Sequence, residues 1–463
     1  MSKFRHGLLL AIFCLSFLFS GVRAQNSTAG PLYEVQAGDT LYLIALRFDV
    51  SVDDLVEANQ ITDPNVLSPG TRLVIPGLTG IEGLLVTENI QLGQNLTSLS
   101  RYYQVPVEQL DQLNRITSPA EVYTGASLII PQSDRPARAP GGNLPMGMSL
   151  LEYAAIHQSS PWEVAAYNAV AKPADILPNE PLYKPSQEDE SDPGSSLEPL
   201  VTKLELAPLP LVQGSTAVVH IAASQPVEIA GSLNGKDLHF FSNGENDYVA
   251  IQGIYALAEP GLAEFGLEVK TADGETRSYQ QMLLLQDGYY PKDEPLTVDP
   301  ATLDKAVTGP EDDLIRQTTA PANPQRAWSG IFRLPVDEPY CIRSWYGNRR
   351  SYNGSGYIYF HTGLDYGVCA TLNIYAPAPG TVVYTGPLTV RGNATIIDHG
   401  WGVYSGFWHQ SEILVEQGQT VQAGDLIGMI GGTGRVTGPH LHWEVWANGV
   451  QVNPQEWLDR AIP

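Results

Sequence analysis

The sequence predicts a multidomain chain in which repeated βααβ modules are followed by two β-rich domains. At 463 residues the chain is long enough for about three domains of roughly 150 residues each. Its 44 glycines and 35 prolines, with only 16% charged residues, favour short strands and turns over long helices. A strand–helix–helix–strand pattern that closes on a proline also recurs before residue 186, which is typical of an internal repeat.

The N-terminus has the pattern of a secretory signal. Lys3 and Arg5 precede an apolar run over residues 8–19, and Ala24 ends a short stretch typical of a cleavage site. We therefore expect residues 1–24 to be a signal peptide and the protein to be secreted. The run is short for a membrane span, so we expect no stable span after cleavage, with an uncleaved anchor as the alternative.

The acidic charge of the chain limits its partners. The formal net charge is −24 at pH 7. Nucleic acids and anionic membranes would be repelled by such a protein, whereas neutral sugar polymers would not. We therefore expect no nucleic-acid partner.

The first module covers residues 33–76. Asp39 or Thr40 can cap a helix, and Ser51 can cap a second one. Apolar residues recur in the first helix at three- and four-residue spacing, namely Leu41, Ile44, Ala45 and Phe48. A Pro69-Gly70 turn then leads into a closing strand that ends at Ile75-Pro76.

This stretch resembles a LysM module, and the pattern returns twice. Residues 86–131 keep the apolar positions and Asn114 but have Gln94-Asn95 where the first copy has Asp39-Thr40. Residues 144–185 form a degenerate third copy that keeps Asn168. The resemblance implies binding of N-acetylglucosamine polymers such as peptidoglycan or chitin by the first copy. It leaves open whether the second and third copies bind sugar or act as spacers.

Three further segments precede the last domain. Residues 186–199 are acidic, rich in Pro, Gly and Ser, and poor in apolar residues, which predicts a linker. Residues 200–290 contain six or seven short alternating strands, with hairpin signals at Asn234-Gly235 and Asp273-Gly274, and predict a β-sandwich. Residues 291–326 read as a connector with one short helix near residues 301–307.

The last domain, residues 327–463, contains the residues that could carry chemistry. His440 and His442 are two apart on a predicted strand, so their side chains share one face. His361 and Asp365 would stand roughly 13 Å apart on a straight strand, and they can share an ion only if the chain bends at Gly363.

These residues could together form a metal site. His361, Asp365 and one histidine of the 440/442 pair would give two imidazoles and one carboxylate. Three nitrogen or oxygen ligands with an open fourth position are typical of catalytic zinc. Zinc would supply a nucleophile near neutral pH and polarise a carbonyl. The alternative is that the histidine pair serves only packing or surface polarity.

The whole domain resembles the lysostaphin- and LytM-type zinc metallopeptidases, through the segments "SWYGNRRSYNG", "HTGLDYG", "YSGFWH" and "GPHLHWEV". The resemblance implies an all-β catalytic domain with antiparallel sheets and a groove. It assigns the zinc ligands to His361, Asp365 and His442, and two catalytic histidines to His409 and His440. We expect His440 to be the general base and His409 to stabilise the oxyanion or protonate the leaving amine, although the sequence leaves open which of the two has which role.

Two positions depart from the family pattern, and one further histidine needs an interpretation. Phe407 stands where a tyrosine is usual, and Gln410 follows His409 where a leucine is common. We read His399 as a structural residue. Cys341 and Cys369 remain after signal removal and are expected to form a disulfide, because thiols outside the cell usually pair. A role as zinc ligands is the alternative, and their spacing argues against it.

The sequence thus predicts a secreted, cell-wall-associated zinc endopeptidase that hydrolyses peptide cross-links of bacterial peptidoglycan and is held on wall glycan by its LysM modules. Two alternatives are a regulator without enzymatic activity and a glycan-binding protein whose peptidase activity is incidental. The bond that is cut, a role in self-wall remodelling or in attack on other cells, autoinhibition and the oligomeric state stay undetermined.

Overall fold

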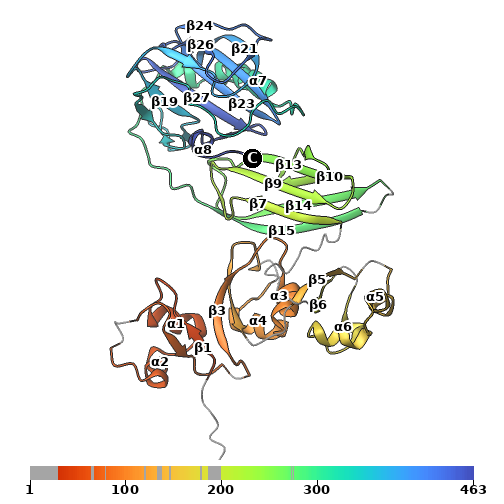
Figure 1. Cartoon of the computed structure of the whole chain (residues 1–463). Helices are drawn as coiled ribbons and strands as arrows, with labels where there is room; N and C mark the ends of the chain where they lie inside the picture. The colour runs from red at the N-terminus through yellow and green to blue at the C-terminus, as the bar shows by residue number, and fades with distance from the viewer. Residues whose placement is uncertain are drawn as a thin grey trace, which may run out of the picture. The chain divides into compact units, whose positions relative to one another are not determined.

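The computed structural model describes residues 30–63, 67–78, 80–118, 121–132, 138–144, 147–177, 180–185, 200–272, 274 and 276–463 (Figure 1). The predicted signal peptide and the predicted linker at 186–199 lie outside these residues. The chain divides into two compact units, Met1–Leu85 and Val86–Pro463, and each is described by itself. No helix in the described ranges is long and apolar enough to span a membrane.

The first unit contains the predicted strand, helix, helix and strand. These are β1 (Leu32–Glu34), α1 (Leu41–Phe48), α2 (Val52–Asn59) and β2 (Arg72–Val74), with β1 antiparallel to β2. Thr40 caps α1 by accepting a hydrogen bond from the Leu43 amide, and Ser51 caps α2 in the same way. The apolar residues predicted for the inner face of α1 are all buried. Local capping and spacing were therefore sufficient to predict this module.

The same element order occurs twice at the start of the second unit. The first copy there has β3 (Leu84–Asn89), α3 (Leu96–Tyr103), α4 (Val107–Asn114) and β4 (Ser127–Gln132). The next has β5 (Arg138–Asn143), α5 (Leu150–Ile156), α6 (Pro161–Tyr167), the 3₁₀ turn η2 (Pro173–Asp175) and β6 (Pro181–Pro185). Its first strand begins before residue 144, where the sequence pattern had placed the start of the copy.

One asparagine performs the same task in all three copies. The Asn59 side chain donates to the carbonyls of Leu55 and Val74 and accepts from the Val74 amide. Asn114 and Asn168 make the equivalent three bonds in their own copies. Each asparagine thus joins the end of the second helix to the closing strand and satisfies backbone groups that would otherwise be unpaired.

The β-sandwich consists of two sheets around one core, as predicted. Its strands are β7 (Val201–Ala207), β8 (Leu211–Val212), β9 (Thr216–Ala223), β10 (Val227–Leu233), β11 (Lys236–Asp237), β12 (Phe241–Gly244), β13 (Asp247–Gly253), β14 (Gly261–Thr271) and β15 (Thr276–Gln286). The sheet orders are β11-β10-β14-β15-β8 and β12-β13-β9-β7. Phe265 from one sheet and Val219 from the other belong to the same buried cluster. The sequence did not predict short strands such as β8 and β11, because a strand of two residues is too short to show an alternation of apolar and polar side chains.

The helix predicted near residues 301–307 is too short. The structure has a 3₁₀ turn, η3 (Pro300–Leu303), followed by α7 (Lys305–Thr319), which continues through Pro310. A proline inside a helix removes one backbone hydrogen bond and usually ends the helix. Here the buried residues Glu311, Ile315 and Thr319 recur on one face, and Ile315 packs in a cluster with Trp408 and Trp446. This tertiary burial outweighs the local preference.

The last domain is built on antiparallel strands. Its elements are β16 (Ile342–Ser344), β17 (Arg349–Arg350), β18 (Tyr359–Phe360), β19 (Leu364–Gly367), β20 (Asn373–Tyr375), β21 (Gly380–Leu388), β22 (Gly392–Gly400), β23 (Val403–Gln410), β24 (Glu412–Ile413), β25 (Thr420–Val421), β26 (Leu426–Met429), β27 (His440–Ala447), β28 (Val450–Val452) and α8 (Gln455–Asp459). The main sheet has the order β16-β19-β27-β23-β22-β21-β25, and β28 pairs with β27.

Strand β27 lies inside this sheet, between β19 and β23 (Figure 1). Leu441, Trp443 and Val445 are buried in the main core of the domain. Because side chains alternate along a strand, His440 and His442 point to the opposite face. The predicted disulfide is confirmed: Cys341 and Cys369 are bonded, beside β16 and after β19.

Candidate functional site

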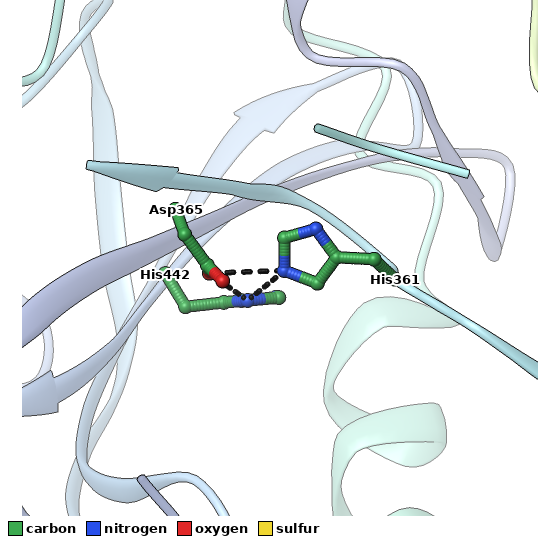
Figure 2. Close-up of side chains that lie close together, drawn as sticks. All are labelled: His361, Asp365 and His442. Carbon is green, nitrogen blue, oxygen red and sulfur yellow. Dashed lines mark hydrogen bonds and ion pairs between the residues drawn. The ribbon is translucent and has the colours of Figure 1, made fainter. Parts of the chain in front are cut away.

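The register of the central strands brings the predicted metal ligands together. Asp365 on β19 is the direct neighbour of His442 on β27. Oδ1 of Asp365 lies 2.8 Å from Nδ1 of His442 and 2.9 Å from Nε2 of His361, and the two ring nitrogens are 3.0 Å apart. Figure 2 shows the three side chains converging on one point. All three residues are buried.

The chain bends before β19, as the sharing of one ion requires. His361 precedes the strand, which begins only at Leu364. The His361 ring is held by a hydrogen bond of 2.9 Å between Nδ1 and the carbonyl of Trp345. Gly363 lies against β27 so closely that a β-carbon there would overlap the Trp443 carbonyl. The glycine therefore permits a close approach of two backbone segments.

Two further histidines complete the predicted set. In His440, Nδ1 bonds the Gly438 carbonyl at 2.8 Å, and Nε2 lies 3.5 Å from Oδ1 of Asp365. In His409, Nδ1 bonds the Thr433 carbonyl at 2.8 Å, and its ring centre lies 4.9 Å from that of His440. A carbonyl can only accept, so each Nδ1 carries the proton and each Nε2 is left as an acceptor.

His409 also has an unusual backbone. Its φ is 65°, in the left-handed region, at the end of β23. Non-glycine residues adopt this region uncommonly, and it carries some backbone strain. The bulge between β22 and β23 at this point re-aims the ring toward His440.

The electrostatics favour positive charge at the centre of the site. Burial opposes ionisation of Asp365, but the adjacent His361 and His442 outweigh it and hold its pKa well below the usual value. Burial also acts to lower the pKa of His442, yet hydrogen bonds to Asp365 and Glu444 raise it to about 9. In His409, burial and then the neighbouring histidines lower the pKa to about 3. His409 is therefore neutral near pH 7.

Sequence reasoning missed Glu444. It lies on β27 two residues after His442 and is 2% exposed. Its Oε1 is 3.0 Å from Nε2 of His442. The signal was available, because positions 440, 442 and 444 follow the two-residue period of a strand and so share one face.

The five predicted residues line one cavity of about 570 Å³. Its walls also include Arg350, Arg391 and Arg435, as well as residues of the segment that contains η3 and α7. Glu311 of α7 accepts hydrogen bonds from the Val390 and Arg391 amides. Arg435 donates to the Thr302 carbonyl at 3.0 Å. The segment before the last domain thus forms one wall of the cavity, which its sequence did not indicate.

His399 does not belong to this site. Its ring bonds the Pro379 carbonyl at 2.7 Å and the Ser405 hydroxyl at 2.9 Å, and it is fully buried. Gln410 is buried too and donates to the Thr395 hydroxyl and the Phe407 carbonyl. Phe407 belongs to the main core. These contacts are structural.

Comparisons with known proteins agree with this division of the chain. Residues 359–454 match the family model described as Peptidase family M23. Residues 33–76 and 89–131 match the LysM domain. The first range contains all five predicted site residues.

Curated relatives match over the same region. The peptidoglycan DD-endopeptidase ShyA of Vibrio cholerae serotype O1 is 39% identical over 129 residues, which is 28% of this chain and 29% of the relative. The DD-carboxypeptidase/endopeptidase Mpg of Neisseria meningitidis serogroup B is 43% identical over 94 residues, 20% of this chain and 22% of the relative. The chain thus spans less than a third of the length of either relative.

Among solved structures, the catalytic domain of lysostaphin from Staphylococcus simulans is 28% identical, with a TM-score of 0.23. The match covers 26% of this chain and 92% of that one.

Proposed function

Residues 359–454 are a peptidase family M23 domain and residues 33–76 and 89–131 are LysM domains, and from this we propose that the chain is a zinc-dependent endopeptidase that hydrolyses peptide cross-links of bacterial peptidoglycan. One observation carries the proposal. The side chains of His361 and Asp365 converge on one point with that of His442, 77 residues further along the chain, and two more histidines lie at the edge of this point.

The donor atoms suit zinc. Ligands that share a tetrahedral zinc ion at about 2.0–2.1 Å lie roughly 3.3 Å from one another. The three separations here are 2.8 to 3.0 Å, so a shift of a few tenths of an ångström in each side chain would suffice. His361 would bind through Nε2 and His442 through Nδ1, because the other nitrogen of each ring already has an acceptor. Cys341 and Cys369 are used in a disulfide and offer no ligand.

The two remaining histidines would move protons. Zinc, when bound, supplies Lewis acidity, which favours deprotonation of a water and polarises a carbonyl. Nε2 of His440 lies 3.5 Å from the Asp365 carboxylate and is placed to accept the proton of the attacking water. His409 lies beside it and would stabilise the oxyanion or protonate the leaving amine once its Nε2 has taken up a proton. We assign the base to His440 because its Nε2 is close to a ligand atom.

The names of the relatives support a wall substrate. ShyA is a peptidoglycan DD-endopeptidase and Mpg a DD-carboxypeptidase/endopeptidase, which favours cleavage of a DD-type bond by this chain as well. The LysM domains at 33–76 and 89–131 would hold the chain on wall glycan. Binding glycan and peptide with one chain raises the effective substrate concentration at the catalytic site. Such an enzyme acts outside the cytoplasm, at the cell wall.

We assign the remaining segments accordingly. Residues 86–131 are the second LysM module, residues 144–185 a third, degenerate one, and residues 200–290 a sandwich that precedes the connector at 291–326. The catalytic domain is placed at 327–463.

The test is mass spectrometry of peptidoglycan fragments released by the purified chain, with a chelated control. We expect new peptide ends that depend on zinc and that identify the bond. A chain that binds zinc but releases no fragment from several wall types would refute the proposal and favour a regulator without enzymatic activity.

A further inference from the structure

Glu444 is a buried carboxylate directly behind a proposed metal ligand. It follows His440 and His442 at two-residue spacing along β27, and its side chain is 2% exposed. Burying a carboxylate costs several kcal/mol unless hydrogen bonds compensate for the lost water. Glu444 lies on the face of β27 opposite the apolar core, and its burial there requires partners that compensate for the lost water.

The contacts of Glu444 converge on His442. Oε1 accepts from Nε2 of His442 at 3.0 Å and from the Thr362 hydroxyl at 2.5 Å. Oε2 accepts from the Gln451 amide at 3.1 Å. Thr362 belongs to the bend that carries His361, and Gln451 lies on β28. The carboxylate is therefore fixed by two independent segments while it holds the imidazole.

This contact determines which nitrogen of His442 faces the other donor atoms. Carboxylates only accept, so without a metal the ring faces an acceptor on each side, Glu444 at Nε2 and Asp365 at Nδ1. Nδ1 lies 2.8 Å from Asp365 and 3.0 Å from Nε2 of His361, so a metal shared by these atoms would take the place of the proton on Nδ1, while Glu444 holds the proton on Nε2. A carboxylate behind a histidine fixes the ring and makes it a stronger metal ligand.

From this geometry we infer that Glu444 is a positioning residue that presents His442 to the metal through Nδ1. The inference rests on the proposed zinc site and deepens it. The alternative is a brace: Glu444 would only tie β27 to β28 and to the bend at Thr362, without effect on the metal.

The two readings are separated by zinc affinity in the full chain. Glu444→Leu removes the acceptor, whereas Glu444→Gln keeps an oxygen that can accept from Nε2 of His442. The matched control is Gln451→Leu, which breaks the bond from β28 to Glu444 but leaves the His442 contact intact. Zinc dissociation constants come from competition with a chromophoric chelator, and nitrogen NMR of labelled histidine rings reports the tautomer.

We expect Glu444→Leu to weaken zinc binding about 10- to 100-fold and Glu444→Gln by less than about tenfold. Gln451→Leu should lower thermal stability at nearly unchanged zinc affinity. The inference is overturned if folded Glu444→Leu binds zinc as the unaltered chain does, or if Glu444→Leu and Gln451→Leu weaken zinc equally. Should Glu444→Leu not fold, the tautomer of His442 in the zinc-loaded unaltered chain decides, and a proton on Nδ1 there overturns the inference.

The outcome is distinct from that for the proposed function. A chain that binds zinc tightly, depends on Glu444 for it and cleaves no peptidoglycan would overturn the proposed function alone. An active enzyme whose zinc affinity is unchanged by replacement of Glu444 would overturn this inference alone.

Discussion

Replacing Gly363 by alanine should damage the proposed metal site with a single methyl group. Gly363 lies between His361 and Asp365 and faces β27. A β-carbon at this position would lie 2.8 Å from Nε2 of His442 and would overlap the carbonyl of Trp443. The backbone of β27 is held on both sides by β19 and β23, so the Trp443 carbonyl cannot move without disturbing the sheet, and the His442 ring must move instead.

The displacement can be estimated from this distance. Van der Waals contact begins near 3.4 Å, so the His442 ring must retreat by roughly 0.6 Å or more. Functional side chains need to be held within about 0.5 Å of their working geometry. A misplacement of about 1 Å can cost 10²-fold in rate, and overpacking a core costs about 1–3 kcal/mol. We therefore expect a loss of about 10- to 100-fold in kcat/KM and a loss of stability of about 1–3 kcal/mol.

The assay combines zinc competition, release of soluble wall peptides and chemical unfolding. Gly438→Ala is the matched control, because Gly438 is in the turn before β27 and a β-carbon there meets nothing within 4 Å. It should leave zinc affinity and rate nearly unchanged. If Gly363→Ala kept the zinc affinity and unfolding free energy of the unaltered chain, the close approach of the bend to β27 would be wrong.

Three further outcomes are expected. Metal analysis after dialysis should show that His442→Ala loses zinc and that His440→Ala keeps it. The turnover of His440→Ala should fall about 10²–10⁴-fold. Loss of zinc in both variants would contradict the division of roles. Replacing both Cys341 and Cys369 by alanine removes a cross-link that spans 28 residues and should lower the unfolding free energy of this domain by about 2–4 kcal/mol. An unchanged unfolding free energy would mean that the disulfide does not form. Burial lowers the pKa of His399 from 6.5 to about 4, so the stability that the neutral ring contributes is complete above about pH 6.5 and is lost as the pH falls toward 4. In chemical unfolding over this window, the unaltered chain should lose up to about 3 kcal/mol more than His399→Asn. Parallel pH profiles of the two chains would contradict this expectation.

Much of the fold could be read locally. In the first module, caps at Thr40 and Ser51 and the spacing of the apolar residues in α1 predicted both helices, since these signals act within one helical turn. The length of α7 could not be read in the same way. Pro310 by itself predicts that the helix ends there. The burial of Ile315 against Trp408, which the local sequence does not show, stabilises its continuation to Thr319.

The candidate site shows the same division. The sequence alone determined that His440 and His442 share a face, because the two-residue period of a strand is a property of the backbone. It indicated through Gly363 that the segment from His361 to Asp365 must bend. It could not show that Asp365 lies next to His442, since strand pairing depends on long-range contacts across 77 residues.

The tertiary structure decided how these side chains act together. It placed the acceptors behind each ring, with the Trp345 carbonyl behind His361 and Glu444 behind His442. These partners determine which nitrogen is free, and a sequence pattern lists residues without their hydrogen bonds. The structure also placed α7 at the wall of the cavity. Local spacing thus determined which residues are available, and the register of the sheet decided which atoms meet.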